Sequence, residues 1–269
     1  MKYFWDEYSS IEKSVDASKA IHLFFDYDGT LTPIKNTPKE AYLHIRVKKL
    51  INKLIKIKKI KLSIISGREL ADVKNLAGIK NIYYAGNHGL EIKGPGMNFV
   101  HPKCIKSKKV IKDIYNKLKL ELVNIKGVVV EYKALTLSVH YRMADVKDIK
   151  TIKKLFTKII EPNTIKNQVL ITQGKKVFEI RPPIKWNKGH AVKKITNHNK
   201  VTGANLSIFV GDDVTDEDAF KILKNKDLSV FVGKKKKTSA KYYLKDTNDV
   251  KKLLRFFINK SSVKIKNEG

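Results

Sequence analysis

The stretch IHLFFDYDGTLT, residues 21–32, decides the fold of this chain. Its apolar first half, closed off by Gly29 and Pro33, predicts a buried parallel strand. The strand delivers Asp26 and Asp28 to the loop at its carboxyl end, where open α/β sheets bind ligands. A nucleophilic aspartate, a second carboxylate two residues on, and a glycine that lets backbone N–H groups approach an anion suit phosphoryl transfer. The alternative is a glycine-containing turn with two solvated aspartates.

Asp-x-Asp-Gly-Thr directly after such a strand resembles the first motif of the haloacid dehalogenase (HAD) superfamily in its phosphatase form. Ion-pumping ATPases of that superfamily resemble each other in carrying Thr two positions after the nucleophile, so Asp28 favours a phosphatase or a phosphomutase. The resemblance implies that Asp26 is the nucleophile, that Asp28 is the general acid and base, and that Gly29 and Thr30 support them.

The composition is that of a globular protein, with 269 residues that are 42% hydrophobic and 30% charged. No apolar run approaches the roughly 20 residues that span a bilayer, and the first twenty residues have no signal-peptide core. The single Cys104 excludes an internal disulfide and a cysteine-based zinc site. We therefore expect a cytoplasmic protein, not associated with membranes, that acts as a monomer.

The formal charge of +30 invites a nucleic-acid hypothesis, because clustered Lys and Arg follow phosphate backbones. However, the lysines are spread over the whole chain, only five arginines occur, and no DNA-binding or base-stacking pattern accompanies them. A general lysine bias explains the charge better. We expect no specific nucleic-acid partner, and a field that attracts anionic substrates.

A second strand is expected at residues 61–65, after an amphipathic helix over residues 39–58. It ends in Ser66-Gly67-Arg68, where the second HAD motif places a Ser or Thr that hydrogen-bonds the phosphoryl group. Ser66 and Glu69 also fit a capping box for the next helix, and both roles are compatible. Gly67 and Arg68 are candidates for substrate binding.

A third strand, residues 81–85, runs into a glycine-rich segment, residues 86–91. By itself this segment predicts a turn, and His88 alone would be a structural residue. Beside the other motifs it resembles the Asn-His-Gly-x-Glu segment of trehalose-6-phosphate phosphatases, where the chain leaves the core domain. That resemblance implies that Asn87 and His88 lie near the substrate.

The pattern then changes to a repeated helix–strand–strand unit, which predicts an antiparallel α+β domain inserted into the parallel sheet. We expect a HAD-like Rossmannoid core with an inserted α+β cap, hinged at residues 94–96 and at Pro182-Pro183. The expected ranges are core 1–93 and 182–258, cap 94–181, and a disordered tail 259–269.

The expected cap strands alternate between apolar and polar residues, so that the polar side chains share one face. Such a face is usually just solvated, yet these side chains are of the kind that binds sugar hydroxyls and phosphate oxygens. The candidates are Glu131, Lys133, His140, Arg142, Glu179 and Arg181. The related phosphatases often read Glu-Asp-Lys-Gly where this chain has Glu-Tyr-Lys-Ala at 131–134, which weakens the inference about the sugar.

The remaining motifs follow the cap. Asn187 can cap a helix that starts at Lys188, which matches the position of the third HAD motif, although Lys188 could also be an ordinary surface lysine. A buried strand at 207–210 then ends in many acidic residues, whose oxygen ligands favour Mg²⁺. The resemblance implies a site held by Asp26, Asp28 (through its backbone carbonyl), Asp212 and Asp213, supported by Thr215 and Asp216. In it, Asp213 or Asp216 binds through water or orients Lys188. Glu217 and Asp218 can instead stabilise a helix dipole, with Thr215 as cap.

Taken together, the motifs resemble the trehalose-6-phosphate phosphatase family over residues 21–257 and imply Mg²⁺-dependent hydrolysis of trehalose 6-phosphate through an aspartyl-phosphate. Three alternatives stay open. They are a phosphatase for another sugar phosphate, such as sucrose 6-phosphate or a glucosylglycerol-type ester, a sugar phosphomutase, and a basic nucleic-acid-binding protein with a decayed enzyme fold.

Overall fold

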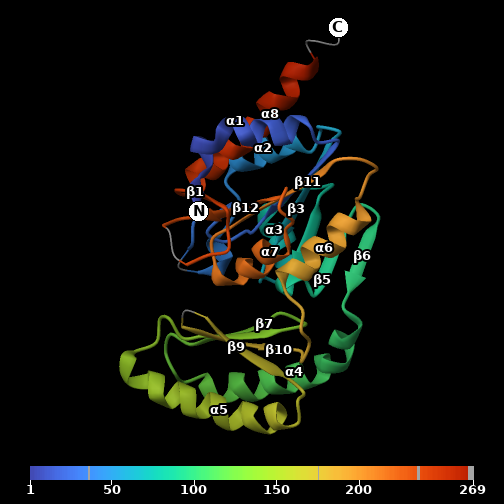
Figure 1. Cartoon of the computed structure of the whole chain (residues 1–269). Coiled ribbons are helices and arrows are strands. Elements are labelled where there is room, and N and C mark those ends of the chain that lie inside the picture. Colours follow the sequence, from blue (N-terminus) through green and yellow to red (C-terminus); the bar gives the residue numbers. More distant parts are fainter. Residues whose placement is uncertain (36, 175, 235–236, 266–269) are drawn as a thin grey trace. The chain divides into compact units, whose positions relative to one another are not determined.

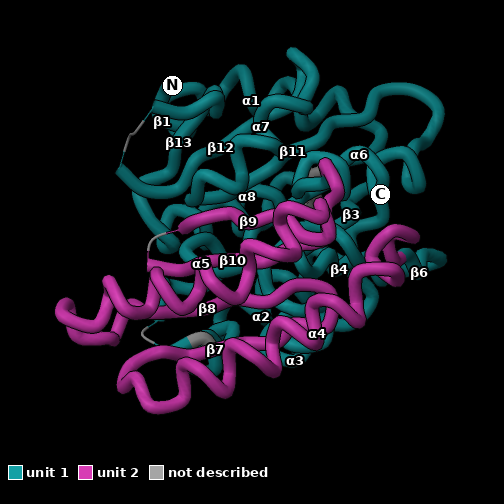
Figure 2. Tube along the Cα trace, turned by 90° about the horizontal axis from the view of Figure 1, so that it is seen from below, with its two compact units in different colours: residues 1–99, 186–269 teal, residues 100–185 magenta. Residues whose placement is uncertain are grey.

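The computed structural model describes the chain except for residues 36, 175, 235–236 and 266–269. The chain divides into two compact units (Figure 2): unit 1 comprises Met1–Phe99 and Trp186–Gly269, and unit 2 comprises Val100–Lys185. Unit 2 is thus an insertion into unit 1. Within the described residues, every helix is too short or too polar to cross a membrane.

The described residues of unit 1 form a nine-stranded sheet (Figure 1) with the order β1-β13-β12-β11-β2-β3-β4-β5-β6. Neighbours from β1 to β4 pair in parallel, and β5 is antiparallel to β4. The strands are β1 Lys2–Tyr3, β2 Ala20–Phe25, β3 Ile60–Ile65, β4 Tyr83–Gly86, β5 Glu91–Gly94, β6 Met97–Val100, β11 Asn205–Gly211, β12 Leu228–Val232 and β13 Tyr242–Leu244.

Helices cover both faces of this sheet, as expected for a doubly wound fold. Buried side chains of α1, α2, α3 and α8 pack with one face, and those of α6 and α7 pack with the other. The helices are α1 Tyr8–Asp16, α2 Ile45–Leu54, α3 Leu70–Ala77, α6 Lys188–His198, α7 Glu217–Ile222 and α8 Thr247–Ile265, with short 3₁₀ turns η1 Phe4–Glu7, η2 Pro38–Glu40, η3 Asn87–Gly89 and η5 Val214–Asp216.

Strand β2 lies at the switch point of the sheet, because β3 follows it on one side and β11 joins it much later on the other. All six residues of β2 are buried, which explains its continuous apolar sequence. In such sheets the ligand site lies beyond the carboxyl ends of the strands at the switch point. The end of β2 is therefore where the candidate site residues meet.

Unit 2 has its own sheet and its own core. The sheet is antiparallel, with the order β7-β8-β10-β9, and its apolar face packs with both helices of the unit. This confirms the expected helix–strand–strand repeat. The elements are α4 Pro102–Leu122, β7 Val129–Tyr132, β8 Leu137–His140, η4 Val146–Asp148, α5 Ile149–Ile165, β9 Leu170–Gly174 and β10 Val177–Arg181.

Two aromatic residues of unit 1 flank the points where the chain enters and leaves unit 2. The rings of Phe99 and Trp186 lie 5.5 Å apart between centroids, and the indole N–H of Trp186 donates to the Gly89 carbonyl at 2.7 Å. The two junctions are therefore held together within unit 1.

Several predicted boundaries differ from the structure. The turn at residues 94–96, expected as a hinge, joins β5 to β6 inside the unit 1 sheet, and the Tyr83 hydroxyl holds it by donating to the Pro95 carbonyl at 2.9 Å. The compact units change at 99/100 and 185/186 instead of 93/94 and 181/182.

Two helices also differ in length from the prediction. The helix expected over 39–58 is shorter, because α2 starts only after His44, whose ring caps it by accepting from the Arg46 N–H. The tail expected to be disordered from 259 continues α8 as far as Ile265, and 266–269 lie outside the described residues. The lysine run at residues 234–237, whose composition favours a solvated loop, lies partly outside the described residues as well.

Candidate active site

The site residues of unit 1 lie where β2, β3 and β11 end. Asp26 follows β2 directly, Ser66 follows β3, and Asp212 follows β11. Asp26 is 5% exposed, and its backbone N–H donates to the Val210 carbonyl at 2.9 Å, which continues the pairing of β2 with β11. The parallel sheet thus brings residues from three distant parts of the sequence to one edge.

Lys188 bridges two of the carboxylates at this edge. It is the first residue of α6, whose start is fixed by the Asn187 side chain accepting from the His190 N–H at 3.2 Å, as predicted. The Lys188 ammonium donates to Asp26 Oδ1 at 2.6 Å and to Asp216 Oδ1 at 2.7 Å. Lys188 is 2% exposed, so it is a buried ion-pair residue and not a surface lysine.

The ionisation of these groups reflects crowding and burial. Burial lowers the pKa of Lys188, but Asp216 and Asp26 outweigh it and raise that pKa above its ordinary value. Burial also raises the pKa of Asp26 well above its usual range, against the opposing effect of Lys188. Burial, reinforced by Asp216, raises the pKa of Asp212 to about 7. Without a further cation, the crowding of three carboxylates around one ammonium thus disfavours the ionised forms of Asp26 and Asp212.

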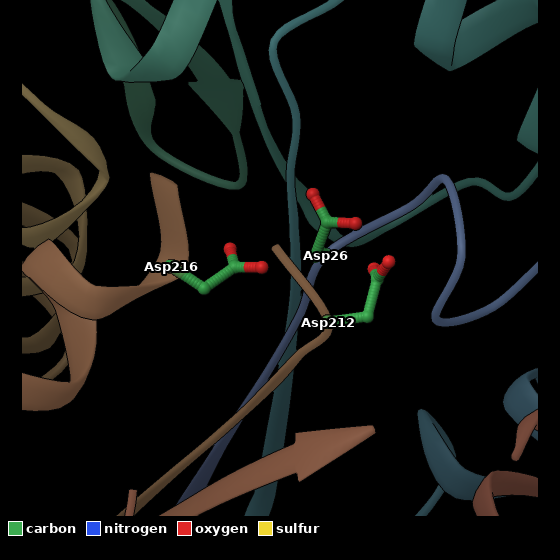
Figure 3. A group of neighbouring side chains, drawn as sticks. All are labelled: Asp26, Asp212 and Asp216. Atoms are coloured by element: carbon green, nitrogen blue, oxygen red, sulfur yellow. The ribbon is translucent and has the colours of Figure 1, made fainter. Parts of the chain in front are cut away.

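Three carboxylates lie close enough to share a cation (Figure 3). One oxygen each from Asp26, Asp212 and Asp216 lies within 4.8 Å of the others. The Thr30 hydroxyl donates to Asp212 Oδ1 at 2.9 Å, and Gly29 leaves room for the same carboxylate, since a Cβ there would lie 2.1 Å from Asp212 Oδ2. An oxygen-only set of this kind suits a hard cation such as Mg²⁺.

The structure separates the two neighbouring acidic residues, either of which was expected to orient Lys188. Asp213 is exposed and lies outside the carboxylate group found in the described residues, whereas Asp216 is fully buried and holds Lys188. Asp216 Oδ2 also accepts from the Asp213 N–H at 2.9 Å, and the two residues form a capping box for η5, whereas α7 has no side-chain cap from its N-cap residue Asp216. Thr215 itself is half-buried.

Ser66 does not form the expected capping box with Glu69. Helix α3 begins at Leu70, with Glu69 as its N-cap residue, so Ser66 lies too far upstream to cap it. The Ser66 hydroxyl oxygen instead accepts from the Arg68 N–H at 3.1 Å. With its oxygen held as an acceptor, the hydroxyl proton remains available for an anion, as the second-motif role requires.

The Arg68 side chain is committed to carboxylates of the protein. Its Nε and Nη2 donate to Asp28 Oδ2 and Oδ1, both at 2.7 Å, and Nη1 donates to Asp72 Oδ2 at 2.8 Å. The sequence predicted substrate binding at Arg68. The structure places its planar fork on the carboxylate expected to act as acid and base.

The segment at residues 87–91 packs against the Ser66 loop. Asn87 is fully buried and donates through its side chain to Glu91 Oε1 at 2.7 Å, and the same oxygen accepts from the Leu70 N–H at 3.0 Å. The His88 ring lies over Gly67, where a Cβ would be 2.7 Å from its Cε1. The contacts of Asn87 and Gly67 thus support a structural role, in which they shape the loop that follows Ser66.

In unit 2, the predicted polar residues share one face of the sheet. Glu131 and Glu179 both lie opposite Ser138. The His140 Nε2 and Glu131 Oε2 are 2.9 Å apart, and the Lys133 ammonium lies 3.9 Å from Glu131 and 3.8 Å from Glu179. We call Glu131, Lys133, His140 and Glu179 the polar cluster of unit 2. Arg142, which is exposed, and Arg181 lie just after β8 and at the end of β10.

Glu91 and Asp72 were missed by the sequence analysis as residues that shape the site. Glu91 was quoted only as part of a motif, and its capping of α3 depends on the antiparallel return of β5. Asp72 lies in the first turn of α3 and pairs with Arg68, which precedes the helix, so this contact depends on the loop before α3 and not on a helical spacing.

Comparison with known proteins identifies the family. The family model described as trehalose-phosphatase matches residues 24–248. The chain is 35% identical over 281 residues to probable trehalose-phosphate phosphatase D of Arabidopsis thaliana, covering 93% of this chain and 74% of that protein. It is 33% identical over 266 residues to trehalose 6-phosphate phosphatase RA3 of Zea mays, covering 91% and 72%.

Solved structures agree with these sequence relatives. The C-terminal domain of the Candida albicans trehalose-6-phosphate phosphatase superposes with a TM-score of 0.79 at 25% identity, over 93% of this chain and 96% of that one. A haloacid dehalogenase-like hydrolase from B. subtilis, at 12% identity and a TM-score of 0.55, shares the fold. With HAD-like architecture and a family match over most of its length, the chain belongs to the trehalose-phosphatase family.

Proposed function

We propose that the protein hydrolyses trehalose 6-phosphate to trehalose and phosphate through an aspartyl-phosphate on Asp26. The observation that carries this proposal is the buried Lys188, which bonds to both Asp26 and Asp216 at the carboxyl end of β2. A carboxylate nucleophile and a dianionic phosphoryl group repel each other, so the reaction needs a buried cation beside them. The family membership and the names of the relatives support trehalose 6-phosphate as the substrate.

The metal of the proposal is Mg²⁺. The carboxylates of Asp26 and Asp212, with the backbone carbonyl of Asp28, would hold it, and Asp216 would keep Lys188 in place. The oxygen-only donors and the raised pKa of Asp212, to about 7, support a site that is completed by a cation. A bound Mg²⁺ would neutralise charge on the transferring phosphoryl group.

In the first half of the reaction, Asp26 Oδ attacks phosphorus in line with the sugar oxygen. The Ser66 hydroxyl and the Lys188 ammonium donate to the equatorial phosphoryl oxygens. The P–O bond to the sugar breaks, and Asp28 gives its proton to the departing oxygen. Asp26 then carries the phosphoryl group and Asp28 is a carboxylate.

In the second half, the Asp28 carboxylate takes a proton from water as that water attacks phosphorus. The P–O bond to Asp26 breaks, phosphate leaves, and both aspartates return to their starting states. Asp28 therefore starts the first half protonated, as an acid, and starts the second half as a carboxylate, as a base.

Recognition of the sugar requires other groups. Asp26, Ser66 and Lys188 contact only the phosphoryl group, so they do not distinguish trehalose 6-phosphate from glucose 6-phosphate. We assign this task to unit 2 as a cap domain, through its polar cluster with Arg142 and Arg181. The support is chemical, since these charged groups share one sheet face and can hydrogen-bond hydroxyls.

The test is phosphate release over a panel of sugar phosphates with Mg²⁺, using wild type and Asp26→Asn. The amide is isosteric but not nucleophilic, so Asp26→Asn should retain less than about a hundredth of the activity, a loss of at least ~2.7 kcal/mol in transition-state stabilisation. Asp6→Asn, at an exposed aspartate of unit 1, is the matched control. Higher residual activity in Asp26→Asn would refute the nucleophile.

The panel also separates the alternatives. If another sugar phosphate is hydrolysed in preference, that compound replaces trehalose 6-phosphate as the proposed substrate. Transfer of phosphate between sugar positions, without release, would indicate a phosphomutase. Magnesium-dependent release that Asp26→Asn abolishes excludes a decayed enzyme fold.

A further inference from the structure

We propose that Arg68 is a positioning residue for Asp28. It binds the carboxylate that Asp28 becomes as it protonates the leaving group, and so promotes breakage of the ester bond. This inference rests on the proposed function, because it assumes Asp28 as the general acid. It replaces substrate binding as the role of the Arg68 side chain.

Arg68 is the fixed partner of the pair. Its side chain is 10% exposed, and Nη1 donates to Asp72 on α3 at 2.8 Å. Its guanidinium carbon lies 5.7 Å from the centroid of the Tyr27 ring, which is fully buried. A second carboxylate and an aromatic ring therefore hold the guanidinium from sides other than the one that meets Asp28.

Asp28 is the less restrained partner. Its side chain is 37% exposed, and both of its oxygens accept from Arg68 at 2.7 Å. Bidentate pairs of this kind fix the plane of the carboxylate as well as its position. Arg68 thus sets where the Asp28 oxygens lie, two residues after the nucleophile.

The chemistry of proton donation gives this pair a function. As Asp28 donates, its O–H bond breaks, a new O–H bond forms on the sugar oxygen, and the electron pair of the broken P–O bond is accommodated there. The negative charge then rests on the Asp28 carboxylate. Two N–H groups already aligned with its two oxygens stabilise that product without reorganisation.

The need for this help depends on the leaving group. A sugar alkoxide is a poor leaving group and needs the proton, whereas p-nitrophenolate leaves readily without one. If Arg68 acts through Asp28, its removal should matter little for p-nitrophenyl phosphate and greatly for esters of poorer leaving groups. A role in holding phosphate would lower both rates equally.

The experiment measures kcat/KM for a series of substituted phenyl phosphates, plotted against the pKa of the released phenol, with trehalose 6-phosphate as the poorest leaving group. We expect Arg68→Gln to lose roughly ten- to a hundredfold on phenyl phosphate and trehalose 6-phosphate, with p-nitrophenyl phosphate changed by less than about threefold. The slope of log kcat/KM against the pKa of the phenol should become steeper than in wild type. It should approach the slope of Asp28→Asn, a variant that lacks the proton donor.

Two further variants sharpen the result. Arg68→Lys keeps the charge but not the fork, so its slope should lie between those of wild type and Arg68→Gln, and it replaces Arg68→Gln if that variant does not fold. In Arg68→Ala, added guanidinium ion should restore the wild-type slope. Glu121→Ala, at an exposed residue of α4, should leave the slope on phenyl phosphates unchanged.

A parallel loss across the phenyl phosphate series in Arg68→Gln, with the wild-type slope kept, would overturn the inference. That outcome is distinct from failure of the proposed function, which would appear as wild-type protein that does not release phosphate from trehalose 6-phosphate or as an active Asp26→Asn variant.

Discussion

Gly29 brings the backbone of the first motif against the carboxylate of Asp212, which follows β11. Its φ of +89° lies in the region that favours glycine, and a Cβ would lie 2.1 Å from Asp212 Oδ2. We predict that Gly29→Ala displaces the Asp212 side chain and lowers kcat on the order of a hundredfold, since misplacement by about 1 Å has that effect. Activity titrated against Mg²⁺ checks this, and the variant should need more Mg²⁺.

Gly78→Ala is the matched control for Gly29→Ala. Gly78 ends α3 with a φ of +57°, and its Cβ would meet the flexible end of Lys48. Both substitutions should lower the free energy of unfolding by about 1 kcal/mol. Only Gly29→Ala should lose activity, so equal activity losses would show that backbone strain, and not Asp212, explains the effect.

For single residues, the sequence predicted which side chains form the site better than it predicted their hydrogen-bond partners. Asp26, Ser66 and Asp212 stand at the ends of predicted strands, and Lys188 was identified only by its match to the third HAD motif. The structure brings Asp26, Lys188 and Asp212 together at one edge of the sheet. The sequence left open whether Asp213 or Asp216 orients Lys188, because the two residues are chemically alike. Only the turn after β11 decides which of them is buried beside Lys188.

Among the elements, the first strand and the last helix of unit 1 are joined by Asp249. It accepts from the Tyr3 hydroxyl at 2.9 Å, from the Lys245 N–H at 3.0 Å and from the Lys252 ammonium at 3.0 Å. Burial would raise the pKa of Asp249, but these partners outweigh it and lower the pKa. The ionised carboxylate therefore stabilises the folded state.

We predict that Asp249→Asn lowers the free energy of unfolding by about 1.5–3 kcal/mol at pH 7, since it removes hydrogen bonds to a charged group. A lowered folded-state pKa gives stability that is present above the unfolded value of ~3.9 and is lost as pH falls through the folded value. Urea unfolding between pH 3 and 7 should thus show wild type and variant converging below about pH 4. Asp6→Asn should stay within about 0.5 kcal/mol of wild type.

Element types were predictable, and boundaries were less so. The parallel strands and the repeated unit of the insertion follow from hydrophobic periodicity. The turn at residues 94–96 was mistaken for a hinge because glycine and proline mark any turn, and only the pairing of β5 with β4 shows that the chain stays in the sheet. The end of α8 was missed because polar residues predominate in its last two turns.

For the molecule as a whole, the proposal separates chemistry in unit 1 from specificity in unit 2. We predict that Glu131→Ala and Arg142→Ala lower kcat/KM for trehalose 6-phosphate roughly ten- to a hundredfold, by loss of a charged hydrogen bond. Hydrolysis of p-nitrophenyl phosphate should barely change.

Glu121→Ala is the control for these two variants, because Glu121 is an exposed residue of α4. It should match wild type on both substrates. Equal losses on trehalose 6-phosphate and p-nitrophenyl phosphate in Glu131→Ala would assign this residue to the fold or the chemistry, and sugar recognition would then need another origin.

The contact between Phe99 and Trp186 makes the insertion separable from its host. Because these two rings lie 5.5 Å apart, the chain of unit 1 can be closed with a few Gly and Ser residues in place of 100–185 without rethreading any strand. The shortened chain should fold cooperatively, by circular dichroism and urea titration, and should hydrolyse p-nitrophenyl phosphate with no preference among sugar phosphates. In a fold of this kind, one catalytic domain can carry different inserted domains for substrate recognition. Substrate range can then change by exchange of a single continuous segment.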